Sequence, residues 1–282
     1  MSNNHSVSRC AVLIGAPGEG QNYLRGVSAD LHNIKNYLLS PNGGRFFPNE
    51  IISLSRAELS DVASVIQGVH VDYLFVYFSG HGYTEKLSNR RMLCLQDAYV
   101  EDLFLLDRSP RQLVIVDACR NYAGAGISGI PQFGEEPDHF DGESEVRNLF
   151  DQLILHSSPG RMIIHGTQQG QYSSDSSSGG YFTRALLEVG TNINAEGNYT
   201  WSSVENILHY VPSVLERNKN FQVPEITYET GNLRVPFAIG VPKPKFRNVL
   251  QPTLISQKPQ VNWNGIALTT LALLLLGAAS SD

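Results

Sequence analysis

A histidine and a cysteine each stand just beyond an apolar run of the chain. His81 follows residues 73–78, and Cys119 follows residues 113–116. A cysteine side chain becomes an effective nucleophile when a base, most often an imidazole, lies within hydrogen-bond distance of it. If the two apolar runs are neighbouring strands of a parallel sheet, both side chains lie at the same edge of that sheet. The pair therefore predicts nucleophilic catalysis by a Cys-His dyad.

The residues on either side of the histidine favour the same interpretation. Gly80 and Gly82 flank His81, and their lack of a side chain lets a substrate backbone approach and leaves a peptide N–H free to point at it. The spacing from His81 to Cys119 leaves room for one crossover between two strands. We expect a helix in that crossover, near residues 101–107.

The elements that must position this pair alternate in type along the chain. Short apolar runs typical of buried strands occur at residues 10–14, 51–54, 73–78, 113–116 and 161–165. Apolar residues at helical spacing occur at residues 27–38, 60–69, 143–156, 182–189 and 204–215, with Ser60 as the expected N-cap of the second helix. This alternation predicts an α/β fold with a largely parallel central sheet and helices on both faces.

Composition and charge exclude several classes of protein. The chain has 282 residues, of which 41% are hydrophobic and 17% charged, as in a globular protein and unlike a disordered chain or a coiled coil. Its net charge of −6 offers no basic field for a phosphate backbone, so nucleic acid is not expected as a partner.

The cysteines indicate a reducing compartment. Cys10, Cys94 and Cys119 form no metal-type pair and no disulfide framework. We expect Cys10 and Cys94 to be buried core residues outside the mechanism. The polar residues 1–9 lack the apolar stretch of a secretory signal, which favours a cytoplasmic location.

At these residues the sequence resembles the caspase-like cysteine peptidases, which include caspases, metacaspases and orthocaspases. The resemblance covers roughly residues 9–239 and lies in Leu24-Arg25-Gly26 with Asp30, Ser79-Gly80-His81-Gly82, Asp117-Ala118-Cys119-Arg120, residues 170–175, residues 180–186 and Gln222-Val223-Pro224. It implies a three-layer sandwich and a peptidase domain at 9–240, with a large-subunit-like part at 9–120, an exposed processing loop at 121–160 and a small-subunit-like part at 161–240.

The resemblance also implies roles for single residues. Cys119 is the expected nucleophile, His81 maintains its thiolate and protonates the leaving amine, and the N–H groups of Gly82 and Cys119 form the oxyanion hole. Water then hydrolyses the thioester. The alternative is a catalytically silent adaptor of the same fold that recruits partners.

In metacaspases, acids at the positions of Asp30 and Asp117 line the S1 pocket and select Arg or Lys before the cut. Two carboxylates in a closed pocket hold a guanidinium by charge-assisted hydrogen bonds and repel an aspartate. Protein substrates with a basic P1 residue are therefore expected. Asp30 has a second interpretation, as a charge near the N-terminus of the first helix.

Some further features concern processing and metals. The segment 121–160 is rich in Gly, Pro and acids, and cleavage after Arg147 or Arg161 is the expected form of self-processing. The sequence requires no cofactor, and no metal site is assigned. Calcium binding stays open, since Asp97 stands at a strand end without a dense carboxylate cluster. His165 also precedes a glycine, but a structural role is expected for it.

The C-terminal part differs from the rest. Residues 241–262 form an expected Pro-containing linker and residues 263–282 a hydrophobic tail, in which residues 266–279 carry no charge. As a helix this stretch would span about 21 Å against about 30 Å of bilayer hydrocarbon. Three interpretations stay open: a membrane anchor, an interfacial docking segment, and a helix buried against the domain or a partner protein. Family members are linked to programmed cell death, stress and defence, which is an analogy only.

Overall fold

A computed structural model describes residues 7–120, 143–173 and 175–242 of the chain. Its centre is a six-stranded sheet of order β12-β8-β7-β3-β1-β2. Five strands are parallel and only β12 pairs antiparallel to its neighbour β8. The strands are β1 (Arg9–Ala16), β2 (Ile51–Ser55), β3 (Tyr73–Gly80), β7 (Arg111–Asp117), β8 (Gly160–His165) and β12 (Glu225–Gly231). The largely parallel sheet predicted from the apolar runs is confirmed.

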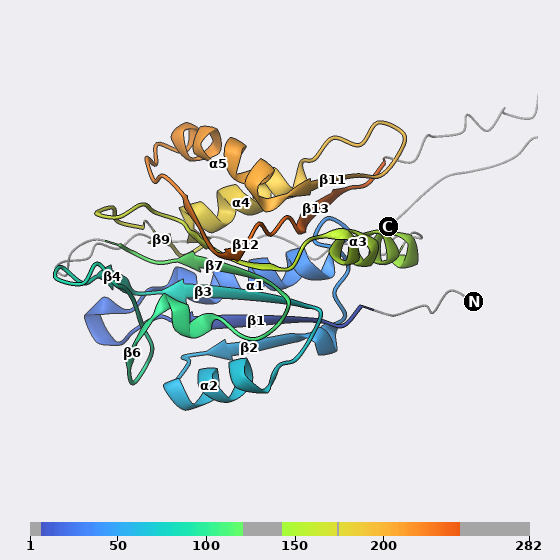
Figure 1. Ribbon diagram of the computed structural model, residues 1–282. Coiled ribbons are helices and arrows are strands. Elements are labelled where there is room, and N and C mark those ends of the chain that lie inside the picture. Colours follow the sequence, from blue (N-terminus) through green and yellow to red (C-terminus); the bar gives the residue numbers. More distant parts are fainter. Residues whose placement is uncertain (1–6, 121–142, 174, 243–282) are drawn as a thin grey trace, which may run out of the picture. The chain divides into compact units, whose positions relative to one another are not determined.

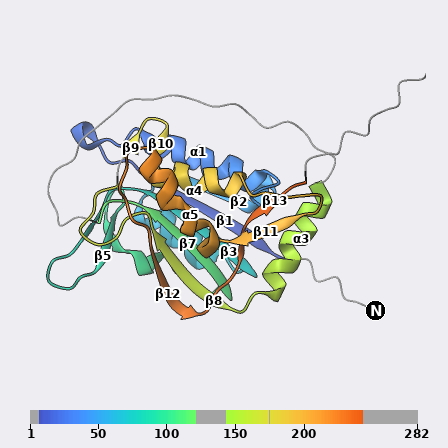
Figure 2. The same cartoon turned by 90° about the horizontal axis from the view of Figure 1, so that it is seen from above.

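Helices cover both faces of this sheet, so the domain is a three-layer α/β sandwich (Figures 1 and 2). One face packs against α1 (Gly26–Leu39), α3 (Glu143–His156), α4 (Tyr181–Thr191) and α5 (Val204–Arg217), and the other against α2 (Leu59–Gly68). In β1 the alternation is direct: Leu13 enters the first core, whereas Val12 and Ile14 enter the second. A strand that is apolar at every position is therefore buried on both sides.

The connection between His81 and Cys119 is not the helix expected near residues 101–107. It is a three-stranded antiparallel sheet, followed by the 3-10 turn η3 (Asp102–Leu105). The apolar residues here are consecutive, and an α-helix would expose half of them. The turn instead buries Leu105 completely and leaves Leu103 38% exposed. The strands of this small sheet are β4 (Gly82–Thr84), β5 (Arg91–Cys94) and β6 (Tyr99–Glu101).

The remaining elements are short: η1 (Gly20–Asn22), η2 (Pro48–Glu50), β9 (Asp175–Ser176), β10 (Gly179–Gly180), β11 (Thr200–Ser203) and β13 (Pro236–Gly240). β9 pairs with β10, and β11 with β13. The helix α2 begins at Leu59, and its N-cap is Glu58, two residues before the expected cap Ser60. The Asp97 Oδ1 accepts the Leu59 N–H at 2.8 Å.

Residues 121–142, residues 243–262 of the expected linker and the hydrophobic tail at 263–282 lie outside the described residues, so the structure does not test the predictions made for them. Within residues 7–120, 143–173 and 175–242, no helix combines the length and the apolar character that a bilayer crossing requires.

Candidate active site

The two candidate catalytic residues lie at the ends of neighbouring strands. β3 ends at Gly80, directly before His81, and β7 ends at Asp117, two residues before Cys119. The strands pair in parallel, with Ser79 opposite Asp117. In Figure 1 both strands end on the side of the domain where β4 and β9 lie. The sheet therefore brings His81 and Cys119 to one edge, which is where parallel α/β sheets carry their sites.

The imidazole of His81 is held by the loop that follows β1. Its Nε2 lies 2.5 Å from the carbonyl oxygen of Asn22. At Gly18 an added Cβ would come within 2.9 Å of the imidazole, and the backbone there has a φ of +74°, so only glycine fits without strain. With Nε2 donating to the carbonyl, the other ring nitrogen, Nδ1, is the free base. Sequence reasoning missed this orienting group because a backbone carbonyl leaves no residue-type signal.

The thiol of Cys119 is partly buried and donates to the carbonyl oxygen of Ser173 at 3.5 Å. Burial raises the pKa of the Cys119 thiol above its ordinary value, and the charges of Asp117 and Asp175 raise it further, against the effect of the Ser173 contact. In the part of the chain that is described, no hydrogen bond joins Cys119 to His81. The structure thus shows no contact through which His81 holds Cys119 as a thiolate, and the role that the resemblance implies for His81 stays a prediction.

Gly82 lies against the backbone of Cys119. It opens β4, pairs with Leu93 of β5, and has room for no side chain: an added Cβ would lie 3.0 Å from the carbonyl oxygen of Cys119 and from the Cβ of Ala118. The backbone of Gly82 and the backbone of Cys119 are therefore adjacent. This is the arrangement that two peptide N–H groups need if they are to converge on one developing oxyanion.

Asp117 is buried at the end of β7, with 4% of its surface exposed. Its Oδ1 accepts the Ser173 hydroxyl at 2.5 Å, and its Oδ2 accepts the Thr183 hydroxyl at 2.7 Å and the Thr183 N–H at 3.2 Å. Burial raises the pKa of Asp117, while these hydrogen bonds lower it. An acid at the end of an apolar strand thus has a full set of donors, as a buried carboxylate must.

Asp30 lies beside it, from the first turns of α1, and is 2% exposed. Its oxygens accept the Ser79 hydroxyl at 2.7 Å and the Gly180 N–H at 2.8 Å. Burial raises the pKa of Asp30 well above its usual range, and the charge of Asp117 adds to that rise. Because its oxygens accept from Ser79 and Gly180 and from no N–H of α1, the interpretation of Asp30 as a charge that only serves its own helix is disfavoured.

A third carboxylate, which sequence reasoning did not assign, joins this pair. Asp175 Oδ2 accepts the N–H of Gly26 at the start of α1, at 3.1 Å. Its Oδ1 is buried and has no hydrogen-bond partner among the described residues. Burial raises the pKa of Asp175, and the charge of Asp117 acts in the same direction. The sequence did contain a signal for Asp175: it is an acid inside a serine-rich loop, within the segment 170–175 that resembles the family.

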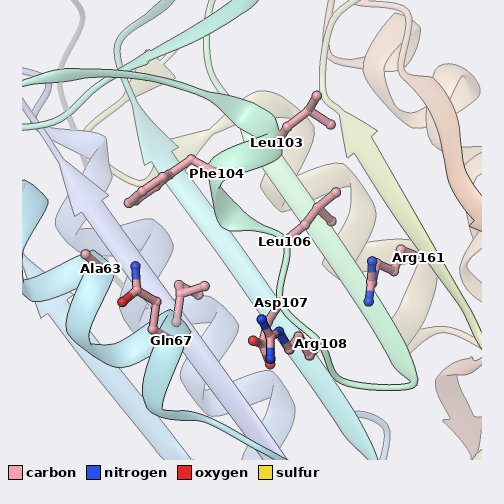
Figure 3. A pocket seen from close by; sticks show the side chains of 9 residues that line it. Ala63, Gln67, Leu103, Phe104, Leu106, Asp107, Arg108 and Arg161 are labelled. Carbon is pink, nitrogen blue, oxygen red and sulfur yellow. The ribbon is translucent and has the colours of Figure 1, made fainter.

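Other candidate residues lie elsewhere. Arg147 is in α3, where Glu50 receives its guanidinium at 2.6 Å. Arg161 is in β8 and lines a groove of about 410 Å³, together with Leu103, Phe104 and Arg108 (Figure 3). None of the candidate catalytic and S1 residues lines this groove.

The two other cysteines, Cys10 and Cys94, differ from each other in burial. Cys10 is buried as expected, but Cys94 is only partly buried, and its N–H donates to the carbonyl oxygen of His81 at 3.0 Å. Burial, together with a smaller contribution from Cys119, raises the pKa of Cys94 to about 11. The expectation that Cys94 is a buried core residue is therefore wrong, and its strand end adjoins the candidate residue His81.

The described residues contain no group of three or more His, Cys, Asp or Glu side chains arranged to hold a metal ion. Asp97, the residue considered for calcium, receives the N–H of Leu59.

Comparisons with known proteins agree with this geometry. A family model described as "Caspase domain" matches residues 8–234. Caspase-1 from Spodoptera frugiperda has a similar structure, with a TM-score of 0.53 and 17% sequence identity over 82% of this chain and 92% of that chain. A search of curated protein sequences found no match. The structural likeness shows the fold, and because the family model spans most of the chain, this protein belongs to the caspase-domain family of cysteine peptidases.

Proposed function

We propose that the protein is a cysteine endopeptidase that hydrolyses protein substrates after Arg or Lys, with Cys119 as nucleophile and His81 as the proton-transfer group. The observation that supports this most is the common sheet edge: His81 and Cys119 follow neighbouring parallel strands, and three carboxylates lie beside them. A dyad next to concentrated negative charge suits a substrate with a positive side chain before the scissile bond.

The orientation of His81 defines the proton path. Nε2 donates to the Asn22 carbonyl, so Nδ1 takes the proton from the Cys119 Sγ as the sulfur attacks the substrate carbonyl carbon. Because the pKa of the thiol is raised, this proton transfer accompanies the attack and does not precede it. The N–H groups of Gly82 and Cys119 stabilise the oxyanion, and Nδ1–H then protonates the leaving amine.

Hydrolysis of the acyl-enzyme completes the reaction. Water attacks the thioester carbonyl and gives one proton to His81, the carbon–sulfur bond breaks, and the sulfur regains a proton. The Cys119 thiol and the neutral imidazole are restored, and the carboxylic acid product leaves.

The three carboxylates form the proposed S1 pocket. Asp175 offers a buried oxygen with no donor, which a guanidinium or an ammonium group would satisfy. Asp30 and Asp117 are already hydrogen-bonded and supply negative charge behind it. Burial raises the pKa of both acids, and the charge of Asp117 raises that of Asp30 further, so a cationic side chain beside them would stabilise their charged forms and an aspartate would destabilise them.

Fluorogenic peptides with Arg, Lys or Asp at P1 test this function. The wild type should cleave the Arg and Lys peptides and spare the Asp peptide, and Cys119→Ala should lose all turnover. Cys10→Ala is the matched control, because Cys10 is a buried free thiol within β1, and it should keep its activity. Absence of Cys119-dependent cleavage of any peptide or protein would instead support the silent adaptor.

Self-processing after Arg147 or Arg161 remains a prediction. Both residues lie in regular structure, α3 and β8, and a peptidase binds its substrate as an extended chain, so cleavage there requires the element to open first. Intact-mass analysis after incubation should show fragments in the wild type and none in Cys119→Ala. An unchanged mass in both would exclude it.

We also propose a cytoplasmic enzyme that is tethered to a membrane through residues 263–282. Fractionation of cells that express the full chain, compared with a chain ending at residue 262, checks this. Detergent-dependent extraction of the full chain alone supports a tether, whereas equal solubility of both chains contradicts it.

A further inference from the structure

A second ionic cluster lies behind the candidate site, around the carboxylate of Asp102. This residue opens η3 and is 0% exposed. Its Oδ2 is contacted by the Arg91 Nε at 2.7 Å and by the His165 Nε2 at 2.8 Å. A buried carboxylate is retained only with such partners, because removing an unpaired charge from water costs several kcal/mol.

Arg91 extends this cluster to the edge of the central sheet. One of its terminal nitrogens, Nη1, donates to the Thr227 hydroxyl at 2.9 Å, and the other, Nη2, lies 3.4 Å from the Glu229 carboxylate. Thr227 and Glu229 belong to β12, and His165 ends β8. The cluster therefore joins β5 and η3, which precede residues 121–142, to two strands that follow them. The small sheet and the central sheet are held together at this point.

The Asp102 cluster is also connected to the backbone next to Cys119. Arg91 stands opposite Thr84 in the β4 and β5 ladder, and Leu93 stands opposite Gly82. The hydroxyl of Thr84, which is 1% exposed, donates to the carbonyl oxygen of Arg120 at 3.0 Å. Arg120 directly follows Cys119. One side of β4 is thus fixed to Asp102 through β5, and the other side is fixed to the residue after the nucleophile.

We propose that Asp102 is a positioning residue: by fixing Arg91, it sets the position of β4, and so aims the N–H of Gly82 at the oxyanion that forms next to Cys119. It touches no reacting atom. The proposal rests on the cysteine peptidase activity proposed above. It predicts that Asp102 matters for steps that form a tetrahedral oxyanion, and matters little for reactions of the sulfur that form none.

Asp102→Asn is the direct test, because the amide keeps the size of the side chain and removes its charge. With an Arg peptide we expect kcat to fall about 10- to 100-fold with KM within about threefold, since a displaced oxyanion donor affects the transition state and hardly affects substrate binding. Inhibition by a peptide aldehyde, whose adduct places an oxygen in the oxyanion hole, should weaken in parallel. Alkylation of Cys119 by iodoacetamide should stay within about threefold of the wild-type rate, because displacement at carbon forms no oxyanion.

Asp107→Asn is the matched control. Asp107 follows the same 3-10 turn, and its carboxylate accepts the N–H and the hydroxyl of Ser109, so its kcat should stay within about twofold of wild type. Thermal melting sets the assay temperature for each variant below its transition. If Asp102→Asn does not fold, Arg91→Lys replaces it: the charge partner of Asp102 remains, the contacts with Thr227 and Glu229 weaken, and kcat should fall with unchanged alkylation.

The outcomes separate the two proposals. A wild type that cleaves no peptide contradicts the proposed function. An active wild type with an unchanged kcat in Asp102→Asn, or in Arg91→Lys if that is the folded variant, overturns the positioning role. Equal losses of kcat, aldehyde affinity and alkylation rate would also overturn it, because they indicate a general disturbance of the site.

Discussion

His81 and His165 occupy similar places in the chain and very different places in the molecule. His81 directly follows β3, His165 is the last residue of β8, and each precedes a glycine. His81 is partly exposed and contacts a backbone carbonyl, whereas His165 is 1% exposed and contacts the carboxylate of Asp102. Burial lowers the pKa of His165, against the opposing effect of Asp102. On our proposal, a strand end provides either a catalytic or a structural histidine, and access to substrate decides which.

Removing each imidazole in turn sharpens this comparison most. His81→Ala should lower kcat by about 10³-fold, within the range for loss of a general acid–base group, and leave the melting temperature nearly unchanged. His165→Ala should lower kcat less than about tenfold and destabilise the fold by about 2 to 4 kcal/mol, because it opens a cavity and leaves a buried carboxylate short of a donor. Peptide assays and denaturant melts of both variants measure the contrast. A stable but inactive His165→Ala would reverse the assignment.

The next largest expected effect is on P1 selectivity, through the carboxylates at the sheet edge that carries His81 and Cys119. Peptides that differ only in Arg or its neutral isostere citrulline at P1 report on charge recognition alone. The wild type should prefer Arg by about 100-fold or more, and Asp175→Asn should reduce that preference about tenfold, since one charge-assisted contact contributes about 1.5 to 3 kcal/mol. An unchanged ratio would remove Asp175 from the proposed S1 pocket.

The pH dependence of thiol reactivity distinguishes a resting thiol from a resting thiolate. Since the pKa of Cys119 lies above the ordinary 9.0, the alkylation rate of the free enzyme should rise about tenfold per pH unit from neutral pH to about pH 9, without a plateau. Rates with iodoacetamide, taken with Cys10→Ala and Cys94→Ala to isolate one thiol, check this. A plateau near neutral pH would mean a His81-stabilised thiolate.

The smallest effect is on stability. The folded-state pKa of Asp30 is raised, so the folded state holds its proton more tightly than the unfolded state does. The wild type therefore loses stability as pH rises from about 4 towards the folded-state pKa. Asp30→Asn lacks this loss: its amide oxygen can still accept the N–H of Gly180, while its NH2 group can donate to the Ser79 hydroxyl oxygen, which in the wild type donates to Asp30.

The melting temperature of Asp30→Asn, relative to wild type, should therefore increase between about pH 4 and about pH 8, by about 2 to 4 °C for each kcal/mol. Its activity on Arg peptides should fall. A difference in melting temperature that does not change with pH would show that folding does not raise the pKa of Asp30.

Sequence reasoning predicted those strands correctly whose burial requires a run of apolar residues. The strands β1, β3, β7 and β8 are buried at nearly every position and each contains a continuous apolar run, and the ends of β3 and β7 fixed the positions of His81 and Cys119. The strand β12 has no fully buried residue and contains Glu225 and Glu229 among polar residues, so it gave no such signal. The carbonyl of Asn22 and the free oxygen of Asp175 depend on how loops far apart in sequence meet, which spacing does not encode.

The central claim is that Cys119 and His81 work together at one sheet edge beside a pocket for a positive side chain. A peptide acyloxymethyl ketone with Arg at P1, followed by peptide mapping by mass spectrometry, tests it directly. We predict a single adduct on Cys119, lost in His81→Ala and absent with the matching Asp reagent. Labelling of Cys94 or Cys10 in place of Cys119, or equal labelling by the Arg and Asp reagents, would contradict the account.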